Sequence, residues 1–174
     1  MVKENPSNPL VALAKEAVES YVRFGKMASA THPVPPEMET IAGVFICLKK
    51  HGQLRGCIGT IEPTQPSLAA EIVMNSVSAA VHDPRFEPVT EEELADLEYT
   101  VDVLGSAEAI TGFTELDPKL YGVIVESGYK RGLLLPDLEG IDTVEEQVSI
   151  AMRKAGIYDG ESVSLYRFQV IRHV

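Results

Sequence analysis

The sequence contains few of the residues that mark the common specialised classes of protein. It has no tryptophan, 6% aromatic residues, and only two cysteines in 174 residues, Cys47 and Cys57. Neither cysteine belongs to a Cys-x-x-Cys or Cys/His spacing, which argues against a disulfide scaffold and against structural zinc. We therefore expect two reduced thiols, and the sequence indicates no metal site and no particular cofactor.

Basic residues and long apolar runs are also scarce. The chain has 15 Lys and Arg against 26 Asp and Glu, and the net charge of −11 disfavours binding to nucleic acid or to an anionic membrane surface. No segment approaches the length of a membrane span, and the first residues lack the apolar core of a signal peptide. These absences predict a cytoplasmic protein whose ligand is a small molecule, a peptide or a protein partner.

Hydrophobic residues make up 45% of the chain, enough to bury a sizeable core. Apolar residues at intervals of three and four predict helices over residues 10–24, 68–81 and 144–155. Alternating or continuous apolar runs predict hairpins over 41–61 and 121–135 and single strands over 98–104 and 162–171. Thr90 and Thr143 each begin a capping box with a glutamate three residues later, and we place Asp102 on the exposed face of its strand.

The irregular order of strands and helices predicts the α+β class, with a mainly antiparallel sheet, flanking helices, and two lobes with a cleft. The sequence shows no internal repeat and no linker, so residues 1–174 are interpreted as one domain with two interleaved lobes. The proline-rich residues 29–38 predict a surface connection in which His32 is solvated. Residues 111–119 carry no clear pattern.

Two glycines bracket Cys57 within the run Leu54-Arg55-Gly56-Cys57-Ile58-Gly59. Gly56 and Gly59 allow another group to approach the main chain, so the thiol can be presented to a ligand. A free cysteine in an apolar strand is also typical of a small buried hydrophobe. Both interpretations stay open at this point.

A second candidate stretch places a histidine, an acid and an arginine in the short proline-containing loop 82–88. His82 can exchange protons, while Asp83 and Arg85 can contact a ligand, with Arg85 holding a carboxylate or phosphate. The structural alternative is that Asp83 caps a turn and Arg85 pairs with Glu87 or another acid.

The stretch 54–59 closely resembles the signature of the AMMECR domain family, whose bacterial and archaeal branch is called AmmeMemoRadiSam system protein A. Further blocks agree in the order that the family implies, and the match covers nearly the whole chain. These blocks are Gly43-Val44-Phe45, Asp83-Pro84-Arg85-Phe86, Pro88-Val89, Glu93-Leu94, Gly132-Leu133-Leu134-Leu135-Pro136 and Lys154-Ala155-Gly156.

The resemblance implies an intracellular α+β domain with two lobes and a cleft near the signature motif. The name of the system implies Memo-like and radical SAM proteins as partners in a shared pathway. It assigns no chemistry to this chain, which lacks the clustered cysteines of an iron–sulfur radical enzyme. It also implies a cysteine in many relatives where this chain has Ala151-Met152-Arg153, and this difference weakens a mechanism with two cysteines.

Two functions are compatible with these residues. In the first, the protein is an enzyme acting on a small or peptide substrate, with Cys57 as nucleophile or thiolate ligand and His82 moving protons. Arg55 or Arg85 then holds an anionic group of the substrate. In the second, the protein is a non-catalytic binding or adaptor module, in which the arginines recognise a partner and Cys57 only packs.

Overall fold

The structure is a computed structural model that describes residues 8–29 and 35–174. The chain forms two compact units. The first comprises the residues up to Val103 together with Arg172–Val174, and the second comprises Leu104–Ile171. Each unit contains its own apolar core.

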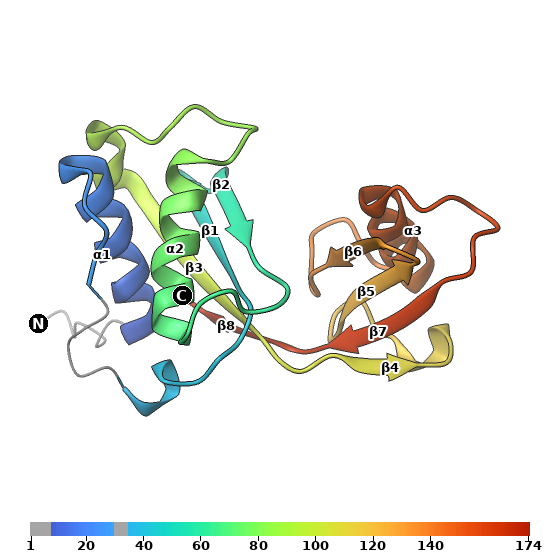
Figure 1. The fold of residues 1–174 in the computed structure, drawn as a ribbon. Coiled ribbons are helices and arrows are strands. Elements are labelled where there is room, and N and C mark those ends of the chain that lie inside the picture. Colours follow the sequence, from blue (N-terminus) through green and yellow to red (C-terminus); the bar gives the residue numbers. More distant parts are fainter. Residues whose placement is uncertain (1–7, 30–34) are drawn as a thin grey trace, which may run out of the picture. The chain divides into compact units, whose positions relative to one another are not determined.

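The first unit consists of a four-stranded sheet with two helices on one face. Asn8 caps the first helix by accepting the Leu10 N–H at 3.0 Å, and Gly25 ends that helix in the left-handed conformation (φ 63°). The elements are α1 (Pro9–Phe24), β1 (Val44–Lys50), β2 (Gln53–Gly59), α2 (Leu68–Val81), β3 (Leu97–Leu104) and β8 (Val170–His173), with the strands in the order β2-β1-β3-β8 (Figure 1).

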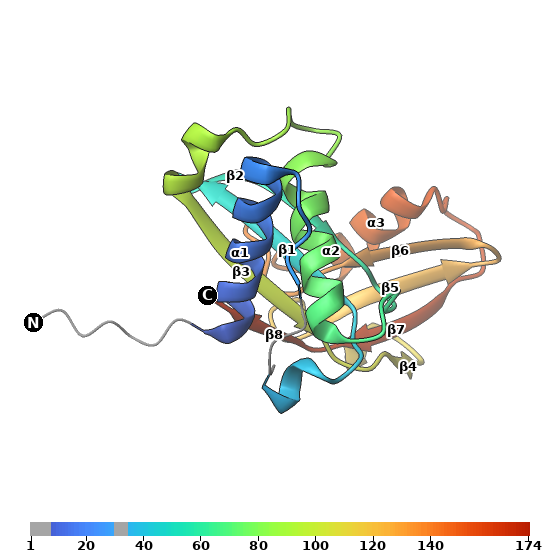
Figure 2. The same cartoon turned by 60° about the vertical axis from the view of Figure 1, so that its left-hand side comes forward.

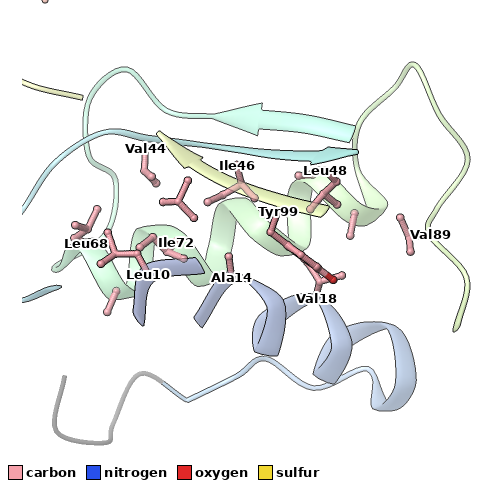
Figure 3. Packing of buried hydrophobic residues seen from close by; sticks show 14 of the residues in the cluster. Leu10, Ala14, Val18, Val44, Ile46, Leu48, Leu68, Ile72, Val89 and Tyr99 are labelled. Atoms are coloured by element: carbon pink, nitrogen blue, oxygen red, sulfur yellow. The ribbon is translucent and has the colours of Figure 1, made fainter. Parts of the chain in front are cut away.

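The core of the first unit lies between this sheet and the two helices. Val44, Ile46 and Leu48 alternate along β1 and are fully buried against apolar residues of α1 and α2 (Figure 3). Successive side chains of a strand point to opposite faces, so Phe45 and Cys47 lie on the face turned away from the helices. We call this the helix-free face of the sheet.

The second unit repeats this plan with one helix. Thr143 and Glu146 form the capping box that begins the helix, and Gly156 ends it in the left-handed conformation (φ 69°). Val123 and Val125 are fully buried in the core beneath the helix, which packs along two strands (Figure 2). The elements are β4 (Glu108–Ile110), β5 (Gly122–Ser127), β6 (Lys130–Leu134), α3 (Val144–Ala155) and β7 (Ser164–Phe168).

The two units share one topology. In each, a hairpin leads into a helix, and the next strand pairs with the first strand of the hairpin. This gives β2-β1-β3 in the first unit and β6-β5-β7 in the second, and a fourth strand, β8 or β4, extends each sheet beside β3 or β7. The sequence shows no internal repeat, so what repeats is the connectivity.

The predicted α+β class, with antiparallel sheets and flanking helices, is confirmed, as are the three helices and both hairpins. The cleft between lobes stays a prediction, and His32 lies outside the described residues. Three short 3-10 helices complete the described elements: Pro36–Met38, Glu91–Asp96, which carries the Thr90 capping box, and Phe113–Glu115. Within the part of the chain that the structure describes, no helix has both the length and the apolarity needed to cross a bilayer.

Two expectations about strands were wrong. The single strand predicted over residues 162–171 is divided into β7 and β8, which belong to different sheets. Asp102 is 3% exposed rather than solvated, because Arg172 donates two hydrogen bonds to its carboxylate at 2.8 and 2.9 Å. Arg172 lies 70 residues from Asp102 in the sequence, so no local pattern around Asp102 predicts this contact.

Candidate functional site

The two cysteines lie directly opposite each other on the hairpin of the first unit. Cys57 on β2 pairs in register with Cys47 on β1. Directly opposed residues share a face, so both thiols lie on the helix-free face, and both are half-buried. The structure therefore joins the predicted Cys57 to a second thiol that sequence reasoning left without a role.

The loop that follows α2 fixes the main chain of Cys57. Strand β2 is an edge strand, and Asp83 and Arg85 occupy its free edge at this residue. The Cys57 N–H donates to Oδ2 of Asp83 at 2.9 Å, and Nη2 of Arg85 donates to the Cys57 carbonyl oxygen at 3.2 Å. Both main-chain groups of Cys57 thus point away from β1, which makes Cys47 and Cys57 a non-hydrogen-bonded pair of the ladder.

Asp83 is a buried structural carboxylate. It is 4% exposed and accepts the Arg85 N–H at 3.1 Å, as well as guanidinium hydrogen bonds from Nε at 3.0 Å and Nη2 at 2.7 Å. The Arg85 guanidinium holds the pKa of Asp83 far below its ordinary value, since these bonds outweigh the effect of burial. The turn-capping interpretation of Asp83 fits this geometry, and its partner Arg85 comes from the same loop.

Arg85 also faces solvent and a ring. Its side chain is 55% exposed, and the guanidinium carbon lies 5.5 Å from the centroid of the Phe86 ring. Arg85 thus anchors the edge of β2 and presents positive charge beside the thiols.

The electrostatics of the thiols distinguish the two sulfurs. A hydrogen bond from Cys57 lowers the pKa of Cys47 to about 7, against the opposing effect of burial and with help from Lys49 and Arg172. The same hydrogen bond, together with burial, raises the pKa of Cys57. One thiol of the pair is therefore more acidic than an ordinary cysteine, and the other can donate a hydrogen bond to its thiolate.

The glycines of the motif accommodate close packing. A Cβ atom at Gly56 would lie 2.1 Å from the Ala79 carbonyl oxygen, so only glycine allows α2 to approach β2 this closely. A Cβ atom at Gly59 would lie 2.2 Å from the ring of Phe45, its cross-strand partner. Both glycines have a structural reason for their place in the motif.

Arg55 is committed to a neighbouring acid. Its Nε and Nη2 donate to Glu93 at 2.9 and 2.8 Å, and Lys50 adds a third hydrogen bond to that carboxylate at 3.2 Å. The Arg55 side chain is 15% exposed, and its hydrogen bonds lower the pKa of Glu93 to about 2. Arg55 therefore ties β2 to the 3-10 helix Glu91–Asp96 rather than to Cys57.

His82 is the least engaged of the predicted site residues. It is exposed and ends α2, with its N–H donated to the Ser78 carbonyl oxygen at 2.8 Å. Among the described residues the structure records no hydrogen bond from its imidazole, so no proton path to Cys57 is built. In the same ranges, no group of three or more His, Cys, Asp or Glu side chains is placed to hold a metal ion.

The equivalent place in the second unit carries no thiols. A Cβ atom at Gly132 would lie 2.2 Å from the Ala151 carbonyl oxygen, as for Gly56 beneath α2. The residue after this glycine is Leu133, which pairs with Ile124. Lys154 donates to the Leu133 carbonyl oxygen at 3.0 Å, as Arg85 does to that of Cys57. The Cys47–Cys57 pair is thus matched by an aliphatic pair.

Known proteins resemble this chain over nearly its full length. The family model AMMECR1 matches residues 11–173. A Thermotoga maritima protein is 51% identical over 169 residues, covering 95% of this chain and 97% of its own length. A Methanothermobacter thermautotrophicus protein is 40% identical, covering 92% of this chain and 89% of its own.

Two further comparisons extend this likeness. The Clostridium acetobutylicum protein CA_C1420 is 47% identical over 98% of this chain, which matches 37% of that longer protein. The crystal structure of the uncharacterized protein PH0010 from Pyrococcus horikoshii superposes with a TM-score of 0.85 at 34% identity, covering 94% of this chain and 88% of that one. From the family match and these relatives, the chain belongs to the AMMECR1 family.

Proposed function

We propose that this protein is a thiol-dependent enzyme, or the thiol-bearing partner of one, that acts on a small or peptide ligand with an anionic group. The observation that carries the proposal is the cross-strand pair Cys47–Cys57 on the helix-free face. The aliphatic pair Ile124–Leu133 occupies the equivalent place in the second unit, so this topology does not require thiols there.

In this proposal the two sulfurs have different roles, one as nucleophile and the other as hydrogen-bond donor. Cys47 carries the thiolate, which is the nucleophilic form of the group, and the Cys57 thiol donates a hydrogen bond to it. Asp83 and Arg85 hold the main chain of Cys57 at the strand edge, so the donor is fixed in place. Arg85 supplies a charged, half-exposed group for an anionic part of the ligand.

The alternative is a non-catalytic binding or adaptor module, in a pathway with Memo-like and radical SAM proteins in the cytoplasm. The structural contacts of several motif residues favour this alternative. Gly56 packs against α2 and Gly59 against Phe45, while Arg55 donates hydrogen bonds to Glu93. In this alternative, Arg85 is the recognition residue, and the thiols take no part in chemistry.

The rate of alkylation of each cysteine in the native protein, followed by mass spectrometry across pH, tests the proposal. We expect Cys47 to react with a midpoint near 7 and Cys57 to react more slowly. Cys57→Ala removes the hydrogen-bond donor and should move the Cys47 midpoint towards its ordinary value near 9. Cys57→Ser keeps a donor and should move the midpoint less. If both thiols react only after unfolding, the proposal is wrong and the adaptor alternative is favoured.

A further inference from the structure

The geometry of the Cys47–Cys57 pair fits a bond between the two sulfurs. Because the Cys57 N–H donates to Asp83 and its carbonyl oxygen accepts from Arg85, neither group bonds to β1, and this is a non-hydrogen-bonded pair. In such pairs the Cα atoms typically lie about 4.5 Å apart and the side chains are at their closest. Disulfides span Cα separations of about 4.4 to 6.8 Å, and a non-hydrogen-bonded pair of typical spacing falls within this range.

The sequence offers neither cysteine any other thiol with which to pair. Cys47 and Cys57 are the only cysteines in these 174 residues, so within this sequence only this one internal disulfide can form. Both cysteines are half-buried rather than enclosed. Neither sulfur is held by a metal-binding cluster among the described residues.

We propose that Cys47 and Cys57 are a redox-active dithiol that reduces a disulfide substrate and is left as a cross-strand disulfide. The substrate is a small-molecule or protein disulfide, R–S–S–R. This inference rests on the proposed function, since both use the same thiolate, and it names the class of substrate.

The reaction proceeds in two balanced steps. The Cys47 thiolate attacks one sulfur of the substrate, forming a mixed disulfide and expelling one thiolate, R–S⁻. Cys57 then loses its proton to that leaving group, and its sulfur attacks the Cys47 sulfur and expels the second thiolate. The protein loses two electrons and the proton of Cys57. The substrate gains both electrons and is released as one thiol and one thiolate, and the thiolate takes up from solvent the proton that Cys47 had lost to it.

Arg85 and Asp83 act as positioning residues for the second step. They keep Cys57 opposite Cys47 from the outer edge of the sheet, where neither hydrogen bond is disturbed when the sulfurs join. The resolving sulfur therefore does not depend on a loop movement to reach the mixed disulfide.

Equilibration of the native protein with mixtures of oxidised and reduced glutathione tests the inference. After acid quenching, intact mass and alkylation under denaturing conditions distinguish the dithiol, the glutathione adduct and the internal disulfide. We expect the internal disulfide as the end product, monomeric on a non-reducing gel. Cys57→Ser should stop at a glutathione adduct on Cys47, and Cys47→Ser should form an adduct on Cys57 more slowly.

The outcomes separate this inference from the proposed function. If Cys47 is alkylated rapidly in the native protein but the wild type ends as a glutathione adduct or stays reduced, the dithiol inference is wrong and the proposed function stands. If neither thiol reacts before unfolding, both are wrong. A protein disulfide in place of glutathione, with the same readout, shows which source of the disulfide reacts faster.

Discussion

The two units fold the same hairpin, helix and strand around a glycine and differ in the pair of side chains beside it. In the first unit the residue after Gly56 is Cys57, opposite Cys47; in the second the residue after Gly132 is Leu133, opposite Ile124. A helix carbonyl lies over each glycine, and a cation binds the carbonyl of each following residue. The scaffold is therefore common to both units, and the thiols are particular to one.

The largest expected effect comes from the glycines that the two units share. Gly56→Ala and Gly132→Ala each force a Cβ against a helix carbonyl oxygen at 2.1 or 2.2 Å, and we expect each to lower the free energy of unfolding by about 3 kcal/mol or more. Urea denaturation measures this. Gly112→Ala is the control, because nothing lies within 4 Å of its Cβ position, and it should stay within about 0.5 kcal/mol. If Gly132→Ala left the free energy of unfolding unchanged, Gly132 would not be equivalent to Gly56.

The stability of the first unit should depend on pH at low pH, because Arg55 binds the carboxylate of Glu93. Hydrogen bonds from Arg55 lower the pKa of Glu93 from 4.5 to about 2, so the pair stabilises the first unit fully above pH 4.5. That stabilisation, roughly 3 kcal/mol, is lost as the pH falls through about 2. Hydrogen exchange of the β2 amides should show the loss, and Glu93→Gln should abolish it. If the wild type and Glu93→Gln showed the same pH dependence of β2 hydrogen exchange, Glu93 would not be the group responsible.

The cations at the two strand edges should differ in their contribution to stability. Arg85→Ala removes the bond to Cys57 and leaves Asp83, 4% exposed, without its counter-charge, at an expected cost of about 2 kcal/mol. Lys154→Ala removes the hydrogen bond to the Leu133 carbonyl oxygen, at an expected cost of about 1 kcal/mol. Thermal unfolding compares the two. Equal losses would mean that Asp83 does not depend on Arg85.

The smallest effect on stability is expected where the difference in chemistry is greatest. The double variant Cys47→Val with Cys57→Val gives the first unit an aliphatic pair, as in the second, with side chains close to cysteine in volume, and we expect a change below about 1.5 kcal/mol in unfolding free energy. All thiol chemistry should disappear with it. Circular dichroism and urea denaturation check the fold, and a variant that fails to fold would show that the thiols are needed for packing.

Much of the fold follows from local patterns in the sequence. Helical periodicity and the caps Asn8, Thr143 and Gly156 predict where α1 and α3 begin or end, because a cap is a hydrogen bond between close neighbours. The split between β7 and β8 is not predictable in this way, since the alternation continues through it while the chain changes sheets.

Some residues of the candidate site could likewise be predicted from local sequence, and others depend on contacts between distant segments. Cys57, Asp83 and Arg85 were predicted as neighbours of a ligand, and the structure brings these three together. Cys47 was missed because strand register, which puts it opposite Cys57, is not written in either strand alone. The commitment of Arg55 to Glu93 was missed because the two lie 38 residues apart in sequence.

The hydrogen bonds that the Asp83–Arg85 loop makes to Cys57 restrict how another molecule can bind beside the motif. An open edge strand invites another strand to pair with it, which leads to aggregation or to peptide capture by strand addition. At Cys57 a carboxylate and a guanidinium already fill the places of that strand's carbonyl and amide. A peptide cannot add as a strand at Cys57 unless it displaces these two side chains, so a ligand of the proposed kind would be selected by its side groups rather than by its main chain.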